Sequence, residues 1–259
     1  MLLVGVATLA CKGKGGAADD GGAPAASASA ATPAAVGGGG DTCSTGDEGL
    51  CFEFDTKGGT NEKTCTDDLS GKFNKIAACP KELRFGACRV ATPAMTIFML
   101  AEDGQGGWSS AKYECDKHKG VLTPTPTKEI TATWAKGDLK GPMDGFTMLV
   151  PPHTKLQDVG GVQRADQYAN YFGLSVWKEK LDAAETRKKA MADKDFVGWV
   201  VNTDTKMIWK MKGTNETLYD FAIAVNVGGT DYRCERETLL SSEELANATV
   251  ESCLSLAKK

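Results

Sequence analysis

Nine cysteines are the residues of this sequence whose type and spacing could do chemistry. Cys11 stands alone near the start of the chain, and the other eight follow at Cys43, Cys51, Cys65, Cys79, Cys88, Cys115, Cys234 and Cys253. Cysteine side chains form disulfides, bind metal ions or carry lipid. Nine cannot all pair, and an odd cysteine in a secreted protein requires an explanation of its own. Without Cys11 the set is even, so we expect Cys11 to have a separate role.

The residues before Cys11 support a lipid attachment. Residues 1–10 are apolar but too short to span a membrane, and they are typical of the end of a signal peptide's hydrophobic region. No Lys or Arg precedes Leu2, so we expect the true translation start to lie upstream. The run from Thr8 to Cys11 resembles the lipobox of bacterial lipoproteins, although the family usually has a branched aliphatic residue at the position of Thr8. The resemblance implies cleavage before Cys11 and diacylation of its sulfur. The alternative is a free thiol in a discarded leader.

Residues 11–42 have the composition of a tether. After Cys11 they contain no aromatic residue and consist almost entirely of Gly, Ala, Ser, Pro, Asp and Lys, which cannot bury enough apolar surface to fold. A flexible coil of this length spans roughly 30 Å. In the lipoproteins that the sequence resembles, an aspartate directly after the lipidated cysteine favours the inner membrane. Lys12 occupies that position here, so the resemblance implies an outer-membrane anchor facing the periplasm or the cell surface.

The rest of the chain divides into two regions at a Thr/Pro connector, residues 123–127. Prolines disfavour helix in the residues before them, which indicates a boundary. Residues 43–122 hold six cysteines, and residues 128–259 hold two. A dense cysteine framework is typical of small secreted modules whose cores are too small to suffice. We therefore expect an α+β protein with a small disulfide-rich N-terminal module followed by an antiparallel sheet domain with two helices.

The cysteine-rich module is expected to contain a strand at 50–55, a hairpin of 84–90 and 95–101, and a helix at 109–119 that is capped by Ser109 or Ser110. The stretch from Cys65 to Phe73 and the stretch from Cys115 to Leu122 echo each other. Each has a cysteine on a helix, a glycine that ends the helix and then an apolar residue.

The order of these elements and motifs, with Cys79-Pro80 followed by a glycine two residues before Cys88, resembles a cysteine-rich domain of uncharacterised lipoproteins from myxobacteria and their relatives. That family implies no activity. The pairing of the six cysteines stays open among 15 possibilities.

Residues 128–259 show strand patterns and two helix starts. Alternating apolar residues predict strands in three segments, residues 146–150, 172–176 and 221–227, and a hairpin of 196–201 with 207–211. Gly228 and Gly229 should form a turn that connects the third of these strands to the strand that carries Cys234.

Asp182 with Glu185, and Ser241 with Glu244, are capping-box patterns that open the two helices. On the second helix Cys253 shares a face with Ala246, Val250 and Ala257, which predicts a Cys234–Cys253 disulfide that clamps this helix to the sheet. The opening segment 144–151 and the order of the elements resemble the PsbP-like fold, which implies a non-catalytic scaffold.

Other sites have weaker support. Cys115 and His118 have a spacing that suits zinc, but an oxidised Cys115 cannot bind metal. Asp204 could contact calcium, although a hairpin turn also favours the residues around it. Tyr168, Tyr171 and Trp177, together with Phe172, could line a ligand pocket or simply belong to the core. We therefore predict no cofactor and no metal.

Charge and motif patterns lead to a functional prediction. Residues 42–122 carry twelve acidic and ten basic side chains and residues 128–259 carry nineteen and eighteen, so no basic face for nucleic acid is expected. The chain has only two histidines, His118 and His153, and no hydrolase signature motif. We expect a membrane-anchored extracytoplasmic lipoprotein that acts as a non-catalytic binding or assembly module for a protein or small-molecule ligand. The alternative is a secreted hydrolase whose site is assembled from distant residues.

Overall fold

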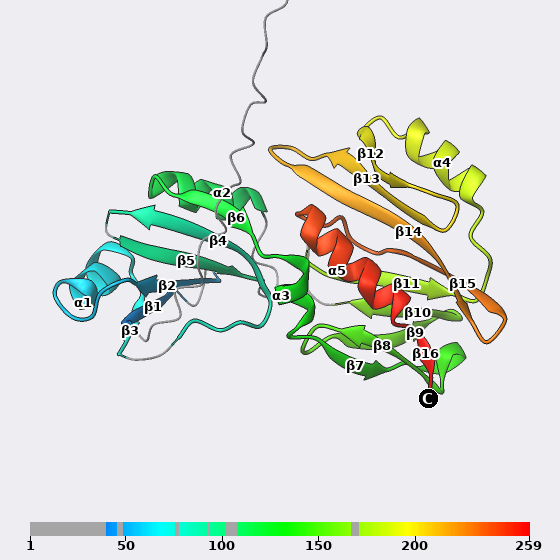
Figure 1. Cartoon of the computed structure of the whole chain (residues 1–259), viewed down its shortest axis with the longest axis horizontal. Helices are drawn as coiled ribbons and strands as arrows, with labels where there is room; N and C mark the ends of the chain where they lie inside the picture. Colours follow the sequence, from blue (N-terminus) through cyan, green and yellow to red (C-terminus); the bar gives the residue numbers. More distant parts are fainter. Residues whose placement is uncertain (1–39, 46–48, 76–77, 93, 102–107, 167–170) are drawn as a thin grey trace, which may run out of the picture. The chain divides into compact units, whose positions relative to one another are not determined.

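Antiparallel β-sheets make up most of the protein in the computed structural model, which describes residues 40–45, 49–75, 78–92, 94–101, 108–166 and 171–259. Within these ranges the strands form sheets of six, seven and three strands, and five α-helices accompany them (Figure 1). The α+β prediction is therefore confirmed only in part, because strands predominate over helices. Signal-like residues 1–10 and most of the tether, including Cys11, lie outside the described residues.

The cysteine-rich module contains the six-stranded sheet, in the order β3-β1-β2-β5-β4-β6. Its elements are β1 (Thr42–Thr45), β2 (Leu50–Phe54), α1 (Asn61–Lys63), the π-helix η1 (Thr64–Asp68), β3 (Lys72–Asn74), β4 (Arg84–Ala91), β5 (Ala94–Leu100), α2 (Trp108–Lys117) and β6 (Val121–Pro124). The predicted strand and hairpin are confirmed. The expected helix is present as α2, and its predicted cap, Ser109 or Ser110, has a side chain outside what the structure describes.

Two similar halves make up this sheet. In the first half Cys43 of β1 is paired with Phe52 of β2, and in the second Cys88 of β4 is paired with Ile97 of β5. Each residue of the second pair stands 45 positions after its counterpart (43 to 88, 52 to 97). Phe52 and Ile97 are themselves paired where the halves meet. The halves are therefore two ββαβ repeats related by an approximate two-fold axis through that pair.

In each repeat a disulfide joins the first strand to the helix. Cys43 is bonded to Cys65 on η1, and Cys88 is bonded to Cys115 on α2. Each return strand then pairs with the first strand of its own repeat, which places β3 and β6 at the two edges of the sheet. The echo in the sequence thus marks a structural repeat.

A one-residue difference between the repeats explains the π-helix. Gly71 follows Cys65 by six positions, whereas Gly120 follows Cys115 by five. Nevertheless, the glycine N–H donates to the cysteine carbonyl in both, at 2.8 Å and 2.9 Å. A π-helical turn is the usual way for a helix to absorb an inserted residue, and η1 lies at this point in the chain.

The C-terminal region contains the other two sheets. Its helices are α3 (Thr127–Thr131), η2 (Gly141–Met143, a 3-10 turn), α4 (Ala183–Ala192) and α5 (Glu243–Leu254). Its strands are β7 (Ala135–Asp138), β8 (Phe146–Val150), β9 (Lys155–Val159), β10 (Val162–Asp166), β11 (Gly173–Trp177), β12 (Phe196–Asn202), β13 (Lys206–Lys212), β14 (Thr217–Val227), β15 (Thr230–Arg236) and β16 (Ala257–Lys258). The expected strands and both expected helices are present. The expectation of two helices is incomplete, because α3 is a third. Thr123 and Pro124 belong to β6 and Thr127 begins α3, so only Thr125 and Pro126 of the connector lie between elements.

The seven-stranded sheet has the order β12-β13-β14-β15-β11-β10-β9. Side chains alternate across its faces. On β14, Phe221 and Ile223 pack in the same core as α5, whereas Leu218 and Ala222 pack with Trp209 and the α4 residues on the opposite face. Each face of the sheet therefore has its own helix and its own apolar cluster.

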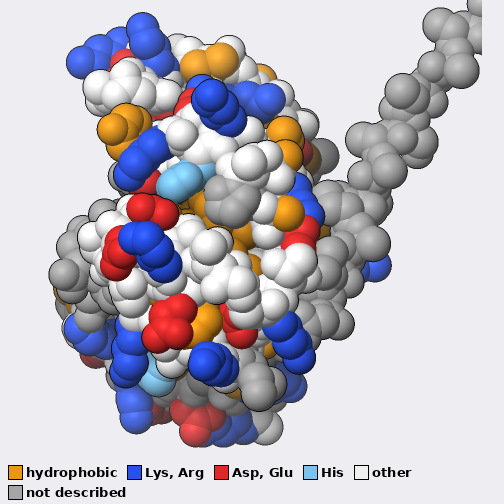
Figure 2. Space-filling view, turned by 90° about the vertical axis from the view of Figure 1, so that its left-hand side faces the viewer, with side chains coloured by type: hydrophobic (Ala, Val, Ile, Leu, Met, Phe, Trp, Pro, Cys, Tyr) orange, Lys and Arg blue, Asp and Glu red, His pale blue; other side chains and the backbone are white. Residues whose placement is uncertain are grey.

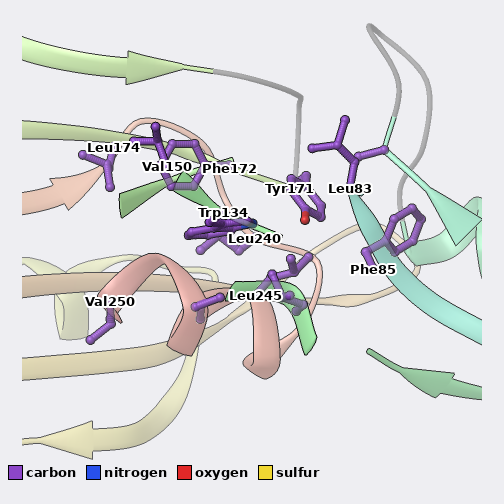
Figure 3. Packing of buried hydrophobic residues seen from close by; sticks show 14 of the residues in the cluster. Leu83, Phe85, Trp134, Val150, Tyr171, Phe172, Leu174, Leu240, Leu245 and Val250 are labelled. Atoms are coloured by element: carbon purple, nitrogen blue, oxygen red, sulfur yellow. The ribbon is translucent and has the colours of Figure 1, made fainter. Parts of the chain in front are cut away.

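Helix α5 is held to both C-terminal sheets. The predicted Cys234–Cys253 disulfide is confirmed and ties α5 to β15. The Ser255 hydroxyl accepts the N–H of Leu149 on β8 at 2.7 Å. Figure 3 shows Trp134 between Phe172 and helix α5. The rings of Trp134 and Phe172 meet edge to face, with their centroids 5.1 Å apart.

The two capping predictions have different outcomes. Asp182 accepts the N–H of Glu185 at 2.9 Å and caps α4 as predicted. On α5 the cap is Ser242, which accepts the N–H of Leu245 at 3.2 Å, so the prediction of Ser241 is wrong by one residue. Glu244 stands three positions after Ser241, as a capping box requires, whereas Leu245 holds that position after Ser242, so the sequence pattern favoured the wrong one of two adjacent serines.

Candidate functional site

The eight cysteines of the described chain form four disulfides among themselves. The open question of the six N-terminal cysteines is settled by Cys43–Cys65, Cys51–Cys79 and Cys88–Cys115. The fourth bridge is Cys234–Cys253. The cysteine left over by this pairing is Cys11.

The aromatic residues proposed to line a pocket are not gathered around one cavity in the described chain. Tyr171 is 2% exposed and belongs to the core, where burial raises the pKa of its phenol. Trp177 ends β11, and its ring lies 4.6 Å from the guanidinium carbon of Arg233. Tyr168 lies outside the described residues.

The histidines and the weaker metal candidates also have definite places. His118 packs edge to face on Phe52, and burial lowers the pKa of its imidazole. His153 is exposed between β8 and β9. Cys115 is bonded to Cys88 and is not available to zinc, and Asp204 pairs with Arg187 at 2.6 Å. Within the described ranges, no three His, Cys, Asp or Glu side chains come together as a metal site.

A cavity of about 610 Å³ opens beside the start of α5. Its lining is almost wholly polar, and it consists of Lys112, Pro124, Asn215, Glu216, Thr217, Tyr219, Ser241, Ser242, Glu243 and Glu244. Most of these residues come from the β13–β14 hairpin and from the start of α5 with the turn before it, whereas Lys112 lies on α2 and Pro124 ends β6. Burial together with Glu243 and Glu244 raises the pKa of the Tyr219 phenol. The cavity therefore offers hydroxyl groups and carboxylates to a polar ligand.

A buried aspartate, Asp220, lies next to this cavity, and half-buried charged residues accompany it. Asp220 follows Tyr219, and its Oδ2 is 2.6 Å from Nε of Arg236. Glu235 lies on the neighbouring strand, and burial raises the pKa of its carboxyl. Carboxyls whose pKa values are raised by burial are typical of functional sites, and structural ion pairs also produce them.

These charged and cavity-lining residues were missed in the sequence because they belong to several separate segments. The available signal was Asp220 itself, a charged residue within a run of apolar strand residues. Its partner Arg236 is distant in sequence, and only the pairing of β14 with β15 brings the two together.

The surface view adds the charge pattern on one side of the molecule. Figure 2 shows the side at the left of Figure 1, where acidic and basic side chains are mixed and no continuous basic area is visible. In the part of the chain that the structure describes, no helix has the length and apolar character needed to cross a membrane.

Fold and site together define a disulfide-bridged, sheet-rich protein with a polar cavity beside its last helix. No protein-family model matches the chain, and no curated protein matches it in sequence.

Proposed function

We propose that this protein is a lipoprotein anchored through Cys11 to the outer membrane, and that it acts outside the cytoplasm as a non-catalytic binding or assembly module. The pairing of the other eight cysteines carries this proposal. Disulfides persist in oxidising compartments, and a set that pairs completely leaves Cys11 as the cysteine for a lipid. The resemblance of residues 8–11 to a lipobox supports the same role.

The cavity beside α5 is the proposed binding place. Its lining of hydroxyls, an amide, carboxylates and the Lys112 ammonium matches a polar ligand that has both hydrogen-bond donors and acceptors. The Ser242 side chain caps α5 at the cavity, and Leu240 and Tyr219 exchange two backbone hydrogen bonds beside it, so this part of the cavity wall is preorganised. Preorganised groups bind with a smaller loss of conformational entropy.

Intact mass of the membrane-extracted protein tests the anchor. We expect a chain that begins at Cys11 with a diacylglycerol mass, and a rise of about eight daltons when the four bridges are reduced. Cys11→Ala should move the protein from the membrane to the soluble fraction, whereas Ser27→Ala in the same tract should leave it on the membrane. An unmodified chain in membranes, or a Cys11→Ala protein that stays there, contradicts the anchor.

A substrate screen tests the non-catalytic part of the proposal. We expect the full-length protein to turn over no ester, peptide or glycoside substrate. Turnover that disappears in His118→Ala or His153→Ala would establish the hydrolase alternative instead.

A further inference from the structure

The most buried residues of the cavity lining are two serines that are held in fixed positions. Ser241 and Ser242 are 3% and 5% exposed, and the Ser242 side chain accepts the N–H of Leu245 at 3.2 Å as the cap of α5. Directly before them in the chain, Leu240 and Tyr219 exchange two backbone hydrogen bonds of 2.9 Å and 3.0 Å. The serine hydroxyls and the Tyr219 side chain therefore keep their places relative to one another.

The charged groups of the lining have opposite signs. Glu243 and Glu244 stand in the first turn of α5, where the positive end of the helix dipole partly offsets their charge. Glu216 lies in the turn of the β13–β14 hairpin, and Lys112 of α2 brings an ammonium group to the same cavity. An anion would meet three carboxylates here, whereas a cation would meet Lys112 and the N-terminal end of α5. Neither sign of charge is therefore matched throughout the cavity.

Hydroxyl groups on a ligand suit such a lining, because one hydroxyl both donates and accepts hydrogen bonds. Carboxylates only accept, whereas an ammonium group only donates. The first N–H groups of α5 have no partner within the helix, so they add further donors. A ligand with several hydroxyls can satisfy the carboxylates and the donors at the same time, and hydrogen bonds to the carboxylates are about twice as strong as those between neutral groups.

The cavity also has apolar surface and the size of a small-molecule site. Tyr219 is half-buried and presents an aromatic ring together with its hydroxyl, and Pro124 adds a saturated ring at the end of β6. A sugar ring has hydroxyls at its rim and C–H groups on its faces, which is the combination that these side chains complement. The volume of about 610 Å³ lies within the usual range for small-molecule pockets, about 300–1,000 Å³.

We propose that the cavity beside α5 binds a short, uncharged oligosaccharide. This inference rests on the proposed binding function and extends it to the class of ligand. Hydroxyls of the sugar donate to the glutamate carboxylates and accept from Lys112 and the first N–H groups of α5, while a C–H face of the sugar packs on the Tyr219 ring. Burial and the two nearby glutamates raise the pKa of the Tyr219 phenol, so this group remains a hydrogen-bond donor at neutral pH.

Isothermal titration calorimetry of the full-length protein tests this assignment. The probes are neutral disaccharides of glucose, galactose, mannose and N-acetylglucosamine. We expect at least one of them to bind with a Kd of about 1 mM or lower, which corresponds to about −4 kcal/mol. Because the ligand carries no charge, its affinity should change by less than about twofold between 50 mM and 500 mM NaCl.

Two substitutions of similar size place the binding in this cavity. Tyr219→Phe keeps the ring and removes one hydroxyl, so it should weaken binding about five- to tenfold. Glu243→Gln removes a charged acceptor and should weaken binding by about tenfold or more. Tyr113→Phe is the matched control, because Tyr113 is 68% exposed on α2 and is not part of the lining, and this variant should bind like the native protein. Circular dichroism checks that each variant is folded.

The assignment is wrong if none of the disaccharides binds, or if both Tyr219→Phe and Glu243→Gln bind them as tightly as the native protein. Titrations with spermidine and with inorganic phosphate separate this failure from a failure of the proposed function. If a charged probe binds with an affinity that changes in Glu243→Gln, and the disaccharides do not bind, the cavity is a binding site and only the ligand class is wrong. If neither the disaccharides nor the charged probes bind, the cavity also loses its place in the proposed function.

Discussion

Replacement of Gly120 by alanine is expected to destabilise the cysteine-rich module by about 3 kcal/mol, at the upper end of the usual effect of overpacking. A Cβ at this position would lie 2.1 Å from Sγ of Cys88 and 2.9 Å from the carbonyl oxygen of Arg89. The first atom belongs to a disulfide and the second to the backbone of β4, so neither moves easily. Urea unfolding of the full-length protein, followed by circular dichroism, measures the loss.

The repeat provides a second copy of this test. At Gly71 the added Cβ would lie 2.3 Å from Sγ of Cys43, so Gly71→Ala should lower stability by a similar amount. Gly198→Ala is the matched control, because its Cβ would meet nothing within 4 Å, and it should change stability little. If Gly120→Ala and Gly198→Ala unfold at the same urea concentration, the close approach to the disulfide is not real.

Removal of the Cys234–Cys253 disulfide with the double substitution Cys234→Ala/Cys253→Ala is expected to lower the free energy of unfolding by roughly 3 kcal/mol. The bridge closes a sequence separation of 19 residues, and without it the unfolded chain regains that loop entropy. Both cysteines are 1% exposed, so the loss of packing acts in the same direction. Four of the five tryptophans, at 134, 177, 199 and 209, lie in the C-terminal region, so tryptophan fluorescence reports on this transition.

Leu254→Ala is the control for this disulfide. Leu254 follows Cys253 on α5 but is 56% exposed, and a surface substitution of this kind usually changes stability by less than about 0.5 kcal/mol. If the Cys234→Ala/Cys253→Ala variant is as stable as Leu254→Ala, packing alone holds α5 to the sheet.

Local patterns predicted the strands that carry their large apolar side chains on one face. On β14 the alternation of apolar residues from Phe221 to Val227 was sufficient, because the two faces of that strand lie in different environments. The turn at Gly228 and Gly229 could also be predicted, because a tight hairpin turn favours glycine. Both glycines have positive φ in the structure. The short, polar strands β7 and β9 carry no such signal, and their pairing depends on neighbours elsewhere in the chain.

The cavity and its buried charges are a different case. Tyr219 and Glu244 come from separate elements, and neither has a local pattern that indicates a cavity. Asp220 and Arg236 meet because β15 leaves its regular register with β14 at Glu235. Such register details depend on how whole strands pack, and a pattern of single residues does not contain them.

The sequence by itself determined the number of cysteines, the odd place of Cys11, the tether composition, the main strands and the Cys234–Cys253 bridge. The bridge could be predicted because Cys253 faces the core on a helix next to the strand of Cys234. Only the tertiary structure decided the other three pairings, the two-fold repeat and the Asp220–Arg236 ion pair. Each of these depends on contacts between residues far apart in the chain, and strand order and register, rather than local propensity, bring those residues together.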